Sequence, residues 1–146
     1  HVRYVPKTGH SLEDSDALET LISYYQYILS KIERPVFSWK VDPSTIHIST
    51  DPDDPPTEIK LWQARSDERS RDFWIDVIGK AWTDSTLTIQ PDGEYEIDLD
   101  VPDGGWKACF VELIYDQEGK LPLKLTTGVT VLPDEYPFEP FESGGE

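Results

Sequence analysis

The chain has 146 residues, of which 37% are hydrophobic and 12% aromatic, so it can bury one ordinary core. Its formal net charge of −16 comes from 29 acidic residues against 13 basic ones. This balance disfavours DNA, RNA and anionic lipid as partners, because these are themselves negative. No segment is apolar over the length of a transmembrane helix, so we expect no membrane insertion.

The acidic residues raise the question of cation binding. Residues 51–56 consist of three aspartates and three prolines and offer oxygen atoms to calcium, but they lack the spacing and the glycine of an EF-hand. A solvated acidic surface is therefore the preferred interpretation, and we expect neither a metal nor a cofactor. The single cysteine, Cys109, allows no intrachain disulfide, and its apolar neighbours predict a small buried side chain.

The chain opens with residues 2–5, which have the pattern of a short strand, and residues 6–10 form a turn. A helix follows, with Asp16 as the predicted N-cap, Glu19 as its reciprocal partner, and an end before Pro35. Its apolar positions recur every three or four residues and predict one stripe, which we expect to pack against a sheet that includes the opening strand. The stripe consists of Leu18, Leu21, Ile22, Tyr25, Ile28, Leu29 and Ile32.

From residue 36 onward the apolar period changes from helical to two, which is typical of strands. The run 106–115 is apolar on both faces and predicts a central strand. About seven short strands separated by Pro, Gly and Asp turns indicate an immunoglobulin-like or fibronectin-like β-sandwich, and therefore a mostly β chain. The predicted strands are residues 36–41, 45–49, 58–64, 72–82 with an interruption near Gly79, 86–89, 94–101, 106–115 and 123–132.

His10 is the main catalytic candidate, because it follows a strand and a glycine turn and precedes an amphipathic helix. An α/β-hydrolase presents its catalytic histidine in this way, so that the imidazole reaches a serine on another loop. The serine and the acid precede the histidine in such enzymes, and no Gly-x-Ser-x-Gly motif is present here. On pattern alone, an ordinary loop histidine is the favoured interpretation. Asp14 and Asp16 are explained as helix-start residues.

The remaining histidines and the tryptophans carry weaker signals. His47 alternates with Ile46 and Ile48, which predicts an exposed histidine on a strand. The five tryptophans fall on different strands, so core positions are favoured over a sugar-stacking platform. The tryptophans are Trp39, Trp62, Trp74, Trp82 and Trp106.

Residues 3–12, with the sequence Arg-Tyr-Val-Pro-Lys-Thr-Gly-His-Ser-Leu, resemble a stretch of the PhoPQ-activated pathogenicity-related and autocrine proliferation repressor family. Several separated blocks in the same order are more specific than a single motif, and they extend the resemblance over nearly the whole chain. The further blocks are residues 61–64, 71–73, 105–108, 110–113 and 123–129, ahead of Pro133 and Asp134.

The resemblance implies a secreted or periplasmic α/β-hydrolase-like protein with a β-sandwich after its core. The expected domains are residues 1–34, the last strand and helix of that core; residues 35–133, the sandwich; and residues 134–146, an acidic tail. His10 would be the triad histidine, with the serine and acid upstream. The absent methionine and the start at His1 suggest a processed or partial chain, which alone should be inert.

Three roles for the intact protein remain open at this point. The first is a serine hydrolase, a peptidase or esterase, with His10 as general base. The second is a secreted signalling protein that restrains proliferation, with the sandwich contacting a protein or receptor partner. The third is a sandwich that only stabilises the hydrolase domain. In each case the expected partner of this chain is the remainder of the parent domain.

Overall fold

The computed structural model describes residues 2–67 and 70–138. The elements follow one another as two helices and eight strands, with strands dominating from Phe37 onward. They are α1 (Ala17–Ser30), β1 (Phe37–Asp42), β2 (Thr45–Thr50), β3 (Glu58–Ser66), α2 (Ile75–Ile78), β4 (Thr83–Leu87), β5 (Glu94–Asp98), β6 (Trp106–Tyr115), β7 (Leu123–Thr126) and β8 (Thr130–Leu132).

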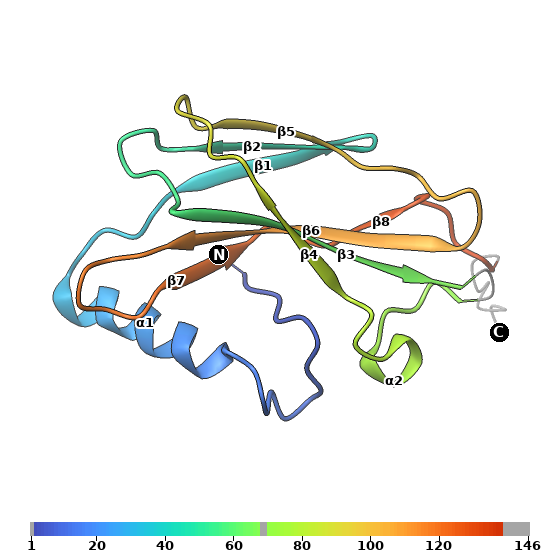
Figure 1. Ribbon diagram of the computed structural model, residues 1–146, viewed down its shortest axis with the longest axis horizontal. Helices are drawn as coiled ribbons and strands as arrows, with labels where there is room; N and C mark the ends of the chain where they lie inside the picture. Colours follow the sequence, from blue (N-terminus) through green and yellow to red (C-terminus); the bar gives the residue numbers. More distant parts are fainter. Residues whose placement is uncertain (1, 68–69, 139–146) are drawn as a thin grey trace, which may run out of the picture.

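The strands form two antiparallel sheets, which confirms the prediction of a mostly β chain. One sheet has three strands in the order β1-β2-β5. The other has five, in the order β4-β3-β6-β7, with β8 also pairing with β6. Figure 1 shows the three-stranded sheet above the five-stranded one, with α1 and the opening segment below both. The molecule therefore has three layers, with the five-stranded sheet in the middle.

Strand β6 is central, as its sequence predicts. It pairs with β3 from Trp106 to Ile114 on one side and with β7 and β8 on the other. Val111 and Leu113 face the core between the sheets, where they join Ile48 of β2. Phe110 and Glu112 alternate with them and face the opening segment, yet both are also buried. Because both faces of β6 are covered, the side chains that point to either face must be mostly apolar, which explains the sequence of this strand.

The predicted strand over residues 72–82 is wrong. The chain forms the single helical turn α2 within this range. The next strand, β4, runs from Thr83 to Leu87, so it starts three residues before the strand predicted over residues 86–89. Asp72 accepts a hydrogen bond from the backbone N–H of Trp74, which starts the turn, and Gly79 ends it with a φ of 59°. Local turn chemistry overrides the strand propensity of this aromatic stretch.

The opening residues 2–5 are not a strand of a sheet. They touch β7 through one bridge, between Val2 and Thr126. The backbone N–H of Tyr4 donates to the hydroxyl of Thr126, not to a carbonyl, so the ladder stops after one step. The segment therefore lies across the end of β7 without extending the sheet.

Helix α1 ends at Ser30, where Lys31 takes a left-handed conformation, so Pro35 is not its stop signal. Asp16 stands at the N-cap position, but its side chain makes no capping hydrogen bond. Its carboxylate binds Arg3 and Lys124 instead, which makes the predicted capping pair with Glu19 wrong. The Asp16 carboxylate therefore binds two cationic side chains in place of the backbone N–H groups of the first helical turn.

The apolar stripe of α1 is uncovered by the described part of the chain, contrary to the expectation that it packs on a sheet with the opening strand. Leu29 is 71% exposed and Leu21 60% exposed, and every other member of the stripe is at least 36% exposed. The helix contacts the sandwich through its other side, where Ser23 and Tyr27 are buried against the β6–β7 region. The helix is attached to the sandwich by its less apolar face.

Candidate functional site

His10 lies on the loop between the opening segment and α1, and its side chain is exposed. The backbone N–H of Leu12 donates to the carbonyl of Gly9, at 3.1 Å, and this hydrogen bond closes a tight turn that contains His10. Leu12 and Asp14 both have positive φ angles, of 56° and 55°, so the loop is sharply bent on its way to the helix. No other residue of the described ranges binds the imidazole of His10, which leaves both ring nitrogens accessible.

A cluster of charged side chains holds the two ends of this loop on the five-stranded sheet. Arg3 Nη2 lies 2.5 Å from Asp16 Oδ1 and 3.4 Å from Glu112 Oε1, and its Nη1 donates to the Asp16 carbonyl. Lys124 Nζ lies 2.5 Å from the other Asp16 oxygen, and Trp62 Nε1 donates to Glu112 Oε2. We call these five residues the anchor cluster.

The charges in the anchor cluster compensate one another. Burial raises the pKa of the Asp16 carboxyl, but hydrogen bonds from Lys124 and Arg3 outweigh it, so the pKa lies below its ordinary value of 3.8. Glu112 is 3% exposed and is buried with both of its carboxylate oxygens bound. Because a buried charge without partners is costly, the cluster fixes residues 3 and 16, and hence the loop that carries His10.

Beneath this loop lies an aromatic surface on the outer face of the five-stranded sheet. Phe110 stacks with Trp62 and is tilted against Tyr4 and Trp82, with ring centroids 5.3 to 6.2 Å apart. Lys7 Nζ lies 5.1 Å above the Trp62 ring. Residues 4–8, this surface and residues 73–75 beside it line a small open cavity of about 210 Å³.

The tryptophans are not in the core, so that prediction is wrong. None of the five belongs to the buried core, and Trp74 is 67% exposed. Trp62 and Trp82 lie under the opening segment, whereas Trp39 rests on Gly128 at the end of the sandwich. Two of the indole N–H groups have polar partners outside the core, because Trp62 donates to Glu112 and Trp106 donates to the carbonyl of Glu135.

The predicted burial of Cys109 is confirmed, whereas His47, predicted to be exposed, is only partly exposed. Cys109 is fully buried, and burial raises the pKa of its thiol to about 11. His47 points away from the buried Ile46 and Ile48 and lies 3.5 Å from Glu96. The Asp51 carboxylate accepts a hydrogen bond from the backbone of Asp53. Within the described ranges, no three His, Cys, Asp or Glu side chains form a metal-binding group, and no helix could span a membrane.

The structure does not place a triad around His10 within residues 2–67 and 70–138. No carboxylate holds either ring nitrogen, and no serine hydroxyl donates to it there. Sequence reasoning missed the anchor cluster, although one signal pointed to it. Glu112 is a single acid in the apolar run 106–115, and a charge in a two-sided central strand requires a buried partner.

Comparison with known proteins identifies the family of the chain. The sequence profile of the PhoPQ-activated pathogenicity-related protein family matches residues 1–74, which include His10, Arg3 and Asp16. The chain belongs to this family. The match covers the loop, α1 and the first three strands, so the family pattern spans the junction between the opening segment and the sandwich.

A curated relative extends the similarity along the rest of the chain. The chain is 30% identical over 162 aligned residues to autocrine proliferation repressor protein A of Dictyostelium discoideum. The alignment covers 94% of this chain and 33% of the relative, so the chain spans about a third of the relative's length. No solved structure matches the chain.

Proposed function

We propose that this chain is the carboxy-terminal part of a secreted or periplasmic α/β-hydrolase-like protein, in which His10 is the general base of a serine hydrolase. The sandwich then follows a core to which residues 1–34 contribute the last helix. The boundaries at residues 34 and 133 remain predictions, as do the upstream serine and acid.

The uncovered stripe of α1 is the observation that carries this proposal. A helix of 14 residues with a continuous exposed apolar face is marginal in water and normally buries that face. The curated relative is about three times as long as the part that this chain matches. Further chain of that kind provides the surface that the stripe lacks, and α1 then carries its preceding loop to the same surface.

His10 suits the role of general base for two structural reasons. Its imidazole is exposed on a tight loop and is unoccupied by other described residues, so one nitrogen can accept a serine proton while the other is held by an acid. The anchor cluster fixes the loop at residues 3 and 16, so the loop holds the imidazole in a defined position. Both features serve a group that must meet a nucleophile on another segment.

The test is labelling of the longer protein with a fluorophosphonate probe, which reacts with an activated serine. His10→Ala should abolish labelling, because the serine loses its base. His47→Ala is the matched control, since His47 lies on β2 in the other sheet and should leave labelling unchanged. Absence of labelling in the unmodified protein, or equal labelling of the H10A variant, would count against the hydrolase function.

A second candidate is favoured by the name of the relative, an autocrine proliferation repressor. In this function the protein is a secreted signal, and the sandwich contacts a protein or receptor partner. The purified longer protein should then slow the growth of the producing organism, and H10A should slow it equally. A truncated protein without residues 36–146 that keeps full activity would exclude the sandwich as the contacting module.

A further inference from the structure

Strand β5 is an open edge of the three-stranded sheet. It pairs with β2 on one side and with no described strand on the other. Within the ladder, the carbonyl of Gly93 accepts from Thr50 and the N–H of Leu99 donates to Ser44. Since hydrogen-bonded positions alternate along an antiparallel strand, residues 95 and 97 also bond to β2. The backbone groups of residues 94, 96 and 98 therefore point to the open edge.

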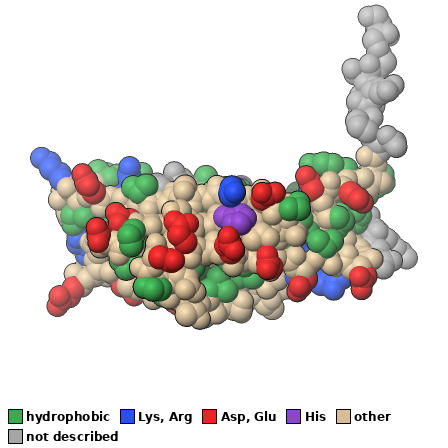
Figure 2. All heavy atoms as spheres, turned by 90° about the horizontal axis from the view of Figure 1, so that it is seen from above, with side chains coloured by type: hydrophobic (Ala, Val, Ile, Leu, Met, Phe, Trp, Pro, Cys, Tyr) green, Lys and Arg blue, Asp and Glu red, His purple; other side chains and the backbone are tan. Residues whose placement is uncertain are grey.

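The same three positions are all acidic. Glu94, Glu96 and Asp98 are exposed on the outer face of the sheet, and each lies beside a β2 side chain. Ser49 donates to Glu94, Thr45 donates to Asp98, and His47 lies 3.5 Å from Glu96. None of the three carboxylates forms an ion pair with a Lys or Arg of the described ranges. Figure 2 shows acidic side chains gathered around a histidine on this face.

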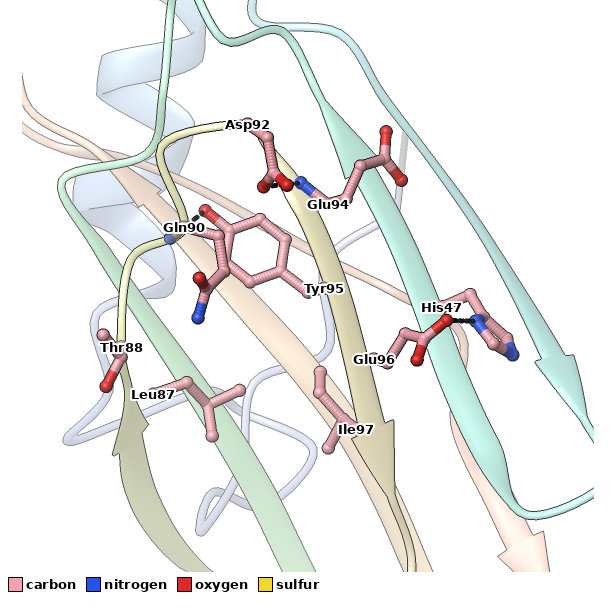
Figure 3. A pocket seen from close by; sticks show the side chains of 9 residues that line it. All are labelled: His47, Leu87, Thr88, Gln90, Asp92, Glu94, Tyr95, Glu96 and Ile97. Atoms are coloured by element: carbon pink, nitrogen blue, oxygen red, sulfur yellow. Dashed lines mark hydrogen bonds and ion pairs between the residues drawn. The ribbon is translucent and has the colours of Figure 1, made fainter.

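A hollow runs along the open edge of β5, and its lining includes the outward-facing His47, Glu94 and Glu96 as well as the apolar Leu87 and Ile97. It has a volume of about 560 Å³ and lies between β5 and the end of β4. In Figure 3, Leu87 and Ile97 lie toward the gap between these strands, whereas Glu96 extends to the other side of β5, toward His47. The edge thus has an apolar inner side and an acidic outer side, with free backbone groups between them.

We propose that β5 is a docking edge for an extended segment of a partner protein in which basic and apolar residues alternate. Such a segment adds a strand beside β5, through the backbone groups of residues 94, 96 and 98. Because side chains alternate between the faces of a sheet, its basic side chains lie opposite the three carboxylates. Its apolar side chains then enter the hollow beside Leu87 and Ile97.

The acidic edge also determines which partners are excluded. Charged side chains on an edge strand discourage pairing between like copies, and this chain carries a net charge of −16. A second copy would bring its own Glu94, Glu96 and Asp98 against the first. The partner that the edge selects is therefore a basic strand of another protein, which places this inference beyond the hydrolase proposal.

The test is binding of a fluorescently labelled peptide, acetyl-Lys-Val-Lys-Val-Lys-Val-Lys-amide, to the 146-residue chain by fluorescence anisotropy. A control peptide with the same residues in two blocks, four Lys and then three Val, has the same charge without the alternation. We expect the alternating peptide to bind about tenfold more tightly, and added salt to weaken it. Equal binding of the two peptides would overturn the proposal, because only the charge would then matter.

Variants of β5 separate the backbone from the charge. Glu96→Pro removes an outward N–H without breaking a bond to β2, and Glu96→Gln removes the same charge but keeps that N–H. The fold should persist in both, and peptide binding should be lost with proline but only weakened with glutamine. The triple variant E94Q/E96Q/D98N keeps oxygens that accept from Ser49 and Thr45, and it should bind about tenfold more weakly. Its matched control, E13Q/D14N/E118Q, removes three exposed acids that lie outside β5 and should retain binding.

The variants also define the contradicting results. The affinity of the alternating peptide must fall in the triple variant and not in its control. Unchanged affinity in the triple variant, or an equal loss in both, would reject β5 as the docking edge. Self-association of the unmodified chain that Glu96→Pro abolishes would assign the edge to a second copy and would also reject it.

Discussion

Arg3 connects the start of the chain to two distant segments, the beginning of α1 and the middle of β6. Its partner Asp16 is also bound by Lys124, so one carboxylate joins three segments of the chain. At the residue scale, the opening segment is therefore held by charge as much as by apolar contact. This attachment is sensitive to the protonation of Asp16.

The pH dependence of Asp16 follows from its lowered pKa. A carboxyl whose folded pKa is depressed stabilises the fold above its unfolded pKa, and this contribution disappears as the pH falls through the folded pKa. Asp16→Asn should cost about 2 kcal/mol of unfolding free energy at neutral pH, because two charge-assisted hydrogen bonds are weakened.

Urea titrations of both proteins check this dependence. The difference in unfolding free energy should shrink as the pH drops below the ordinary value of 3.8. A difference that stays constant from neutral to strongly acidic pH would show that Asp16 is not ionised in the folded protein. Glu13→Gln, at an exposed acid of the same loop, is the control and should have little effect at any pH.

Cys109 gives a second prediction at this scale. The thiolate is the reactive form, and burial raises the pKa of this thiol to about 11. The folded chain should therefore resist iodoacetamide at mildly alkaline pH, whereas the urea-unfolded chain should be alkylated rapidly. Mass spectrometry distinguishes the two states, and fast alkylation of the folded chain would contradict the burial of Cys109.

At the element scale, α1 combines two unlike faces. One is buried on the sandwich through Ser23 and Tyr27, and the other is the exposed stripe. Leu29→Ser should change the unfolding free energy of this chain by less than about 0.5 kcal/mol, because Leu29 already contacts solvent. Leu123→Ala in β7, at a fully buried side chain, should cost about 2–5 kcal/mol.

Thermal or urea unfolding of the two variants measures this contrast directly. A large loss of stability in the L29S variant would mean that the stripe is buried within this chain, contrary to the structure. In the longer protein the same L29S substitution should become destabilising, if further chain covers the helix as proposed.

The contact between Trp39 and Gly128 joins β1 to the connection between β7 and β8. A Cβ atom at residue 128 would lie 2.7 Å from the Trp39 ring, which is too close for an unmoved side chain. Gly128→Val should therefore displace the ring, lower stability by about 1–3 kcal/mol and shift the tryptophan fluorescence. In a W39A background the same substitution should cost much less, and equal costs would show that the ring is not the obstacle.

The sequence predicts most elements well where packing and periodicity agree. Strand β6 has the predicted bounds, residues 106–115, because its two apolar faces match its two covered faces. The strand predicted over residues 72–82 is wrong because Asp72 and Gly79 form local turns, which the alternation of apolar and polar residues does not reveal. The stripe of α1 was visible in the sequence, but periodicity gives only the existence of an apolar face and not what covers it.

At the scale of the whole molecule, the candidate site was only half predictable. His10 could be selected from its glycine turn and the amphipathic helix after it, although residues 2–5 do not form the predicted strand. The family of the chain is confirmed. The anchor cluster joins residues more than a hundred positions apart, and no local pattern encodes such pairs. The triad partners of His10 stay a prediction, because they would lie in chain beyond these 146 residues.

In the proposed parent protein, the stripe of α1 is an internal surface that further chain covers. Hydrogen exchange of the α1 amides, compared between this chain and the longer protein, tests this coverage most directly. We predict that residues 21–30 exchange at least about tenfold more slowly in the longer protein, whereas the β6 amides are equally protected in both. Equal exchange of α1 in the two proteins would contradict the account, since the stripe would then remain open to solvent.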